Sequence, residues 1–202
     1  GIKDPNFTTE RVTYPEPQIL QMLQAVDSTR VATGVLVRDR SQSASILEYA
    51  RVMRIDHRAI ARMLDSLMTT NNLTAQPTPL GTELRVSGDS LVARLAALDT
   101  GFNNTYLANE IADHEQVLTL LDTVLIRSAK TPAIKQTLEQ LRPAYAAHLQ
   151  MARELLAARQ AAAQRAAATP PVTRPAPPPP RIIPIDTPRI RIDSIITTTT
   201  GN

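Results

Sequence analysis

The chain has 202 residues, 43% of them hydrophobic, which is enough for one domain with a buried core plus extensions. Its 22 basic and 19 acidic residues are spread along the chain without the basic stripe that nucleic-acid binding requires. The lack of cysteine excludes disulfides and thiolate metal sites, and no apolar run approaches the roughly 20 residues that span a bilayer.

The composition favours an all-α fold, because Gly is scarce, Trp is absent, and Ala, Leu, Gln and Arg are abundant. Residues 1–17 contain three prolines among polar residues, which predicts an extended N-terminal arm. The chain starts at Gly1 and not at Met, so we expect that an export signal has been removed from it.

Four apolar stripes with steps of three and four residues predict a bundle of four helices over residues 18–168. The fourth helix is expected to continue through Ala-rich sequence to about residue 168. The stripes consist of Ile19, Leu23, Val26, Arg30, Thr33 and Val37; Ile46, Ala50, Met53, His57, Ile60, Leu64 and Leu67; Leu107, Ile111, His114, Leu118, Leu121 and Leu125; and Ile134, Leu138, Leu141, Tyr145, His148, Ala152 and Leu155.

Local signals mark the ends of these helices. Ser45 and Glu48 have the spacing of a capping box, which predicts the start of the second helix. Thr131 is a candidate cap for the fourth helix, with Pro132 at its first position and Pro143 expected to bend it.

The second and third helices are joined by a link of about 30 residues. Asn71 and Asn72 indicate the end of the second helix, and Pro77, Pro79 and Gly81 indicate a loop. A short amphipathic segment is expected from about residue 89 to 98. A link of this length could cross the whole bundle, as in ferritin-like folds, or could be a folded insertion in a simple up-and-down bundle.

All three histidines of the chain fall on apolar stripes, near the middle of the second, third and fourth helices. They are therefore expected to share one layer of the bundle, with Arg30 of the first helix at a similar depth. The candidate buried polar layer comprises Arg30, His57, His114 and His148.

The segments RVMRIDH (51–57), FNNTY (102–106) with DHE (113–115), and RPAYAAHL (142–149) resemble those of a widespread bacterial family. Its members are exported, ferritin-like helical bundles, described as outer-membrane proteins, that form a domain of unknown function. The resemblance covers about residues 19–156 and implies a fold and a location in the cell envelope, but no activity. The chain departs from the family in having Arg30 where an acidic residue is frequent, and Asn103 where Asp is frequent.

Two interpretations of the histidine layer are open. One is a hydrogen-bonded layer that fixes the register of the helices, and the other is a metal site of three histidines with Glu110 as a further ligand. The carboxylate pattern of ferritin-like di-iron centres is absent from the sequence. We favour the hydrogen-bonded layer, with no metal or other cofactor, because the charge of Arg30 would repel a cation; a partly solvated layer or small-ligand pocket is a third option.

Residues 169–202 form a proline- and isoleucine-rich tail that holds nine of the 16 prolines. Such sequence favours extended conformations, and its isoleucines are costly to leave in water. We therefore predict that the tail binds a partner protein, with packing on its own bundle and a flexible spacer as alternatives. The predicted partner-binding residues are Pro177, Pro178, Pro179, Pro180, Arg181, Ile182, Ile183, Ile185, Arg189, Ile190, Arg191, Ile192, Ile195 and Ile196.

No nucleophile elbow, phosphate-binding glycine loop or paired carboxylates stand out in the sequence, so we expect no enzyme. The favoured hypothesis is a structural subunit on the periplasmic side of a larger membrane complex, respiratory or photosynthetic, that is held by its tail and contacted also through the N-terminal arm. The alternative is a free periplasmic bundle that binds metal or serves in a stress response.

Overall fold

The computed structural model describes residues 13–168, which belong to one compact unit and whose regular secondary structure is entirely helical. The predicted all-α class is therefore confirmed for these residues. The elements are α1 (Glu16–Arg40), α2 (Ala44–Thr70), α3 (Pro79–Ala96), α4 (Phe102–Leu120), the π-helical segment η1 (Leu121–Leu125), α5 (Ile126–Ser128) and α6 (Pro132–Ala168). No described helix is long and apolar enough to cross a membrane.

The ends of the chain bear on two predictions. The arm predicted over residues 1–17 is too long, because α1 begins at Glu16. Pro17 lies in the first turn of α1, where a missing amide hydrogen breaks no helical hydrogen bond. The tail 169–202, with every predicted partner-binding residue from Pro177 to Ile196, lies outside the described residues.

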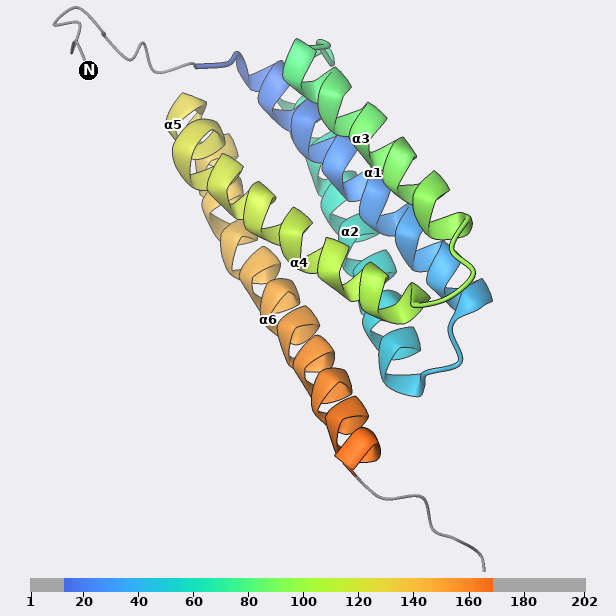
Figure 1. Cartoon of the computed structure of the whole chain (residues 1–202). Coiled ribbons are helices and arrows are strands. Elements are labelled where there is room, and N and C mark those ends of the chain that lie inside the picture. Colours follow the sequence, from blue (N-terminus) through green and yellow to red (C-terminus); the bar gives the residue numbers. More distant parts are fainter. Residues whose placement is uncertain (1–12, 169–202) are drawn as a thin grey trace, which may run out of the picture. The chain divides into compact units, whose positions relative to one another are not determined.

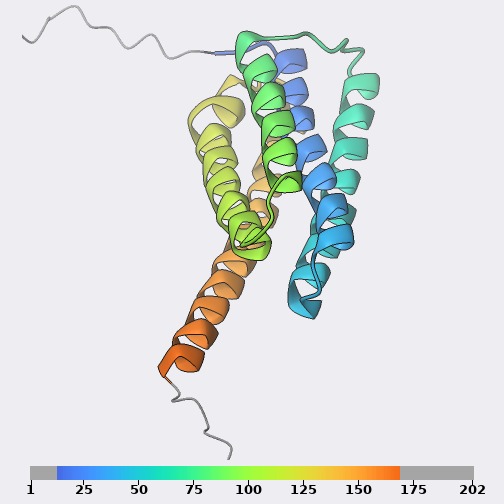
Figure 2. The same cartoon turned by 45° about the vertical axis from the view of Figure 1, so that its right-hand side comes forward.

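Successive long helices alternate in direction (Figure 1). α1 and α2 pack as one antiparallel pair, and α4 and α6 pack as a second. α3 packs along α1 and carries the chain from the end where α2 stops to the end where α4 starts, as a second view also shows (Figure 2). The link between α2 and α4 therefore crosses the length of the bundle, and these two helices run in the same direction.

α3 corrects the prediction of a loop followed by a short helical segment. The helix begins ten residues earlier than expected, at Pro79, and has 18 residues. Pro79 costs nothing at the first helical position, and the hydroxyl oxygen of Thr78 caps the helix by accepting a hydrogen bond from the Gly81 amide at 2.7 Å. The residues expected to break a helix here thus begin one.

The predicted capping of two other helices is wrong. α2 begins at Ala44 without a side-chain cap, and the Glu48 carboxylate instead pairs with Arg51 at 2.7 Å. The hydroxyl of Thr131 donates to Glu16 of α1 at 2.8 Å instead of capping α6. Pro132 is the first residue of α6 as predicted, and the helix continues through Pro143.

The predicted stripes form the core, since every stripe position is buried or partly buried. One apolar cluster contains the first turns of α1 with the ends of α2 and α4 and the start of α6. The other contains the end of α1, the starts of α2 and α4, and Ala152 of α6. The three histidines lie between these clusters along each helix, so the polar layer divides the core. The third predicted helix is confirmed, but a π-helical turn, η1, interrupts it beyond the layer and buries both Leu121 and Leu125.

Candidate metal centre

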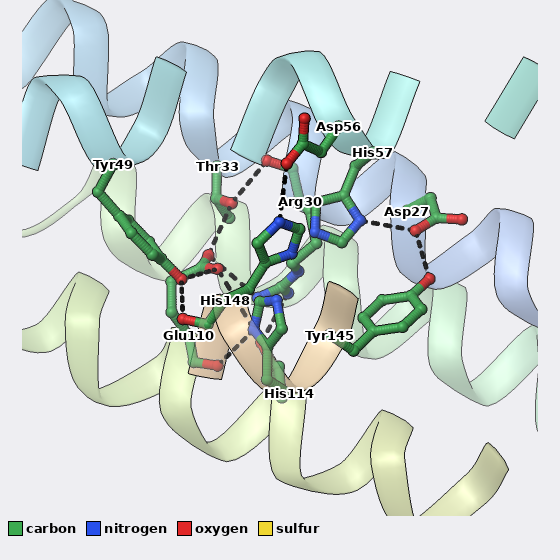
Figure 3. Close-up of polar contacts among 11 residues, drawn as sticks. Asp27, Arg30, Thr33, Tyr49, Asp56, His57, Glu110, His114, Tyr145 and His148 are labelled. Atoms are coloured by element: carbon green, nitrogen blue, oxygen red, sulfur yellow. Dashed lines mark hydrogen bonds and ion pairs between the residues drawn. The ribbon is translucent and has the colours of Figure 1, made fainter. Parts of the chain in front are cut away.

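The three histidines meet in the middle of the bundle, as predicted from their stripes. His57 of α2, His114 of α4 and His148 of α6 are at most 3% exposed. Their ring centroids are separated by 5.1 to 5.7 Å, and one ring nitrogen of each lies within 4.8 Å of one from the other two. Figure 3 shows the three imidazole rings facing one another between the helices.

Each imidazole has one nitrogen held by a partner and one nitrogen without any. The held nitrogens are His57 Nδ1 at 2.7 Å from Asp27 Oδ1, His114 Nδ1 at 2.7 Å from the Glu110 carbonyl oxygen, and His148 Nε2 at 2.9 Å from Asp56 Oδ2. The nitrogens without a hydrogen-bond partner are His57 Nε2, His114 Nε2 and His148 Nδ1. Metal-binding histidines have this arrangement, in which a carboxylate or carbonyl orients the ring and leaves the other nitrogen to the metal.

The surroundings disfavour protonation of His57 and His114. Burial lowers the pKa of His57 well below its ordinary value, and the charges of His148 and Arg30 add to this effect. Burial, with the charges of His57 and Arg30, lowers the pKa of His114 to about 2. A neutral imidazole is the form that binds a metal ion, because the ligand nitrogen must be free of its proton.

The spacing of the nitrogens fits one ion after a small contraction. Three points within 4.8 Å of one another lie at most about 2.8 Å from a common centre, whereas zinc binds histidine nitrogen at about 2.0–2.1 Å. Each ligand nitrogen would therefore have to move by less than about 1 Å towards the centre. The three rings are thus close to the geometry of a three-nitrogen site.

Arg30 lies in the same layer, as predicted, and two carboxylates neutralise it. Its Nη1 donates to Glu110 Oε1 at 3.1 Å, and its Nη2 lies 2.6 Å from Asp113 Oδ2, an ion pair that falls short of hydrogen-bond geometry. The Glu110 carboxylate also accepts from the hydroxyls of Thr33 at 3.2 Å and Tyr49 at 3.4 Å. Glu110, the candidate further ligand in the metal interpretation that the sequence did not favour, is therefore engaged elsewhere.

Comparison with known proteins places the chain in a family. Residues 4–155 match the family described as Domain of unknown function (DUF4142). The chain belongs to this family. The resemblance found in the sequence is thereby confirmed to the extent of a helical domain of unknown function.

The fold of this DUF4142 chain is similar to that of a DUF305 fragment from Deinococcus radiodurans, solved by crystallography. The TM-score is 0.62 at 15% sequence identity, and the match covers 72% of this chain and 97% of the fragment. At this identity the likeness concerns the fold alone. No curated protein matches the chain.

Sequence reasoning missed the carboxyl groups that surround the histidines of the DUF4142 chain. Asp27 is fully buried, and burial raises its pKa to about 7 although a hydrogen bond from the Tyr145 hydroxyl at 2.7 Å opposes the shift. Asp56 and Asp113 directly precede His57 and His114 in the sequence, and Asp27 lies one helical turn before Arg30. A search for acidic residues one position or one helical turn away from the predicted layer would have found these carboxyl groups.

The layer therefore holds more acidic than basic side chains. Its carboxyl groups are those of Asp27, Asp56, Glu110 and Asp113, and its one cationic side chain among the described residues is Arg30. Asp56, Glu110 and Asp113 outnumber Arg30 even when Asp27 keeps its proton, which leaves a surplus of negative charge near the unpaired nitrogens. Such a surplus favours binding of a cation in the layer.

Proposed function

We propose that this DUF4142 protein is a metal-binding helical bundle that holds one transition-metal ion between His57, His114 and His148. The observation that carries the proposal is that all three buried imidazoles keep one nitrogen unpaired while the other is oriented by a partner. This proposal takes up the second of the two functions expected from the sequence, a bundle that binds metal, and it concerns binding, without catalysis.

The competing interpretation, a layer that only fixes helix register, accounts less well for the unpaired nitrogens. A register-fixing layer gains specificity because its polar groups pair with one another across the helices. A buried acceptor without a partner costs about 1–3 kcal/mol, and the layer contains three such nitrogens. A shared metal ion would satisfy all three of them at once.

The ligand set favours an ion of borderline softness. Imidazole suits Zn²⁺, Cu²⁺, Ni²⁺ and Co²⁺, whereas Mg²⁺ and Ca²⁺ select carboxylate and carbonyl oxygens. The nearby carboxylates of Asp27 and Glu110 are occupied by a histidine and by Arg30. We therefore propose Zn²⁺ as the reference ion, with a fourth position left to a small ligand such as water.

Variants that keep the held nitrogen and delete the free one test this proposal sharply. An asparagine amide nitrogen stands near the Nδ1 position and a glutamine amide nitrogen near the Nε2 position. His57→Asn and His114→Asn therefore preserve the hydrogen bonds to Asp27 and to the Glu110 carbonyl, and His148→Gln preserves the one to Asp56. Tyr106→Phe, which removes a buried hydroxyl without a partner, is the matched control.

The measurement is elemental analysis and a competitive Zn²⁺ titration on protein without an affinity tag. We expect one Zn²⁺ per chain in the wild type and in the Tyr106→Phe control. Each histidine variant should weaken binding at least about tenfold, because each removes one of three ligands. Folded histidine variants that bind Zn²⁺ as tightly as the wild type would refute the proposal.

A second candidate function is docking to a larger complex through the tail. The prolines and isoleucines from Pro177 to Ile196 support it, because sequence of this composition favours extended conformations and gains from covering an apolar surface. We keep as proposals the periplasmic location, the membrane complex as partner and a role for the N-terminal arm. Deleting residues 170–202 should release the protein from solubilised native membranes; retention of the shortened chain would count against docking by the tail.

We also propose that the bundle is ferritin-like. The common direction of α2 and α4, with α3 in the link between them, supports this placement. The single three-histidine site would then replace the carboxylate-rich di-iron centre of such bundles, in agreement with the missing carboxylate motif. An experimental structure with metal bound would test both statements.

A further inference from the structure

The histidine layer reaches the surface at two places, both of them acidic. The side chain of Asp56 is 45% exposed and that of Asp113 is 29% exposed. The other charged groups of the layer, Asp27, Arg30 and Glu110, are at most 3% exposed. An ion that travels between solvent and the histidines therefore has two acidic positions at which it can first be captured.

The Asp113 side is closed to cations by Arg30. A cavity of about 120 Å³ between α1, α3 and α4 is lined in part by Asp113 and Arg30. The Arg30 guanidinium forms the ion pair with Asp113 and continues to Glu110, so it stands between Asp113 and the interior of the layer. A metal ion that entered here would have to displace the buried Arg30 side chain from both of its carboxylate partners.

The Asp56 side has no such barrier. Asp56 Oδ2 lies 2.9 Å from His148 Nε2, so a half-exposed carboxylate lies one imidazole ring away from the unpaired His148 Nδ1. In Figure 3, Asp56 and His148 are joined at the edge of the layer, whereas Arg30 lies within it. His57 and His114 have their orienting partners in the fully buried Asp27 and in a backbone carbonyl.

We propose that Asp56 captures the metal ion from solvent at this edge of the layer, from which the ion reaches the unpaired nitrogens of the three histidines. This inference rests on the proposed metal-binding function. Asp56 is then a positioning residue for His148 and also the group that sets the rate of metal uptake. A carboxylate at the mouth of a site raises the local cation concentration and the association rate, and the effect weakens with ionic strength.

Asp56→Asn isolates the charge, because the asparagine carbonyl still accepts the hydrogen bond from His148 Nε2. Rapid mixing of the metal-free full-length protein with Co²⁺, followed by its visible absorption, gives association and dissociation rate constants separately. We expect Asp56→Asn to lower the association rate constant about tenfold at low salt and to reduce its salt dependence. Asp56→Glu should restore most of the rate.

Two variants serve as controls. Asp113→Asn removes one charge at the opposite surface and should lower the association rate constant by less than about twofold. Asp27→Asn alters the orienting partner of His57 inside the core, so its effect should appear mainly in the dissociation rate constant. The contrast between Asp56 and these two positions separates capture from orientation.

A wild-type association rate in Asp56→Asn, with any loss confined to dissociation, would overturn the inference and leave Asp56 only an orienting role. A larger loss of association rate in Asp113→Asn than in Asp56→Asn would also overturn it, in favour of the cavity between α1, α3 and α4. Failure of the wild type to bind Co²⁺ and Zn²⁺ at all would refute the proposed function itself, which the equilibrium titration detects independently.

Discussion

Replacing Asp27 with Asn should change how the stability of the metal-free protein depends on pH. Burial raises the pKa of Asp27 from its ordinary value of 3.8 to about 7. Between these two values the folded protein keeps a proton that the unfolded chain releases. The free energy of unfolding contributed by Asp27 therefore decreases as the pH rises from about 4 to 7 and stays constant above.

The size of the effect follows from the width of that window. Each pH unit within it changes the free energy of unfolding by about 1.4 kcal/mol for one proton. Two units of the window lie between pH 5 and pH 7, so the total change between pH 5 and pH 8 is about 3 kcal/mol. The unpaired Asp27 Oδ2 is a suitable position for the proton, because Oδ1 already contacts His57 and the Tyr145 hydroxyl.

Urea unfolding followed by circular dichroism, in the presence of a chelator, measures this contribution. The stability of the wild type minus that of Asp27→Asn should fall by about 3 kcal/mol between pH 5 and pH 8. Titrations of His57, His114 and Glu110 occur in both proteins and largely cancel in the difference. Asp99→Asn changes an exposed carboxylate and controls for general charge effects.

A difference that is constant over this pH range would refute the account of Asp27 as a buried, largely protonated carboxyl group. Such a constant difference would mean that Asp27 is ionised throughout this pH range in both the folded and the unfolded protein.

Three further predictions concern stability. Gly88→Ala should destabilise the protein by about 1–3 kcal/mol in urea unfolding, because the added Cβ would lie 2.0 Å from the Thr29 hydroxyl oxygen. The additional change Thr29→Ala should recover most of the loss. An unchanged unfolding midpoint in Gly88→Ala would contradict the close packing of α3 on α1. Glu16→Ala should lower the free energy of unfolding by about 1–3 kcal/mol, because the Glu16 carboxylate accepts hydrogen bonds from the amide and the hydroxyl of Thr131. Full stability in the variant would show that this contact contributes nothing. Zn²⁺ at a hundredfold excess over its dissociation constant should raise the melting temperature by roughly 5–10 °C in the wild type, whereas a similar rise in His114→Asn would place the ion elsewhere.

The sequence was sufficient to predict the four stripe-forming helices and the meeting of the histidines. Both follow from helical periodicity, since residues three and four apart share a face and the middle of each stripe falls at a similar depth. The start of α3 could not be predicted in this way. Pro79 and Gly81 break helices in the interior but are accepted in a first turn, and Thr78 caps the helix with its own backbone extended.

The partners of the polar layer were beyond sequence reasoning for a different reason. Arg30 and Glu110 are 80 residues apart, and nothing local to either indicates that they form an ion pair. Asp27 and His57 are 30 residues apart on different helices, and their pairing depends on the relative rotation of α1 and α2. Periodicity gives the depth of a side chain in a bundle, but it does not give the orientation of its terminal atoms.

The case against a metal ion depended on Arg30 being considered alone. An uncompensated guanidinium beside three imidazoles would raise the energy of any cation there, and the histidines would then be best explained as mutual hydrogen-bond partners. Arg30 instead lies against Glu110 and Asp113, and Asp27 and Asp56 contact His57 and His148. A divalent ion would therefore enter a layer with surplus negative charge, where each imidazole already has its second nitrogen fixed. Metal binding should therefore not require the replacement of Arg30 by a neutral residue. The carboxylates compensate the charge of Arg30 before the ion arrives.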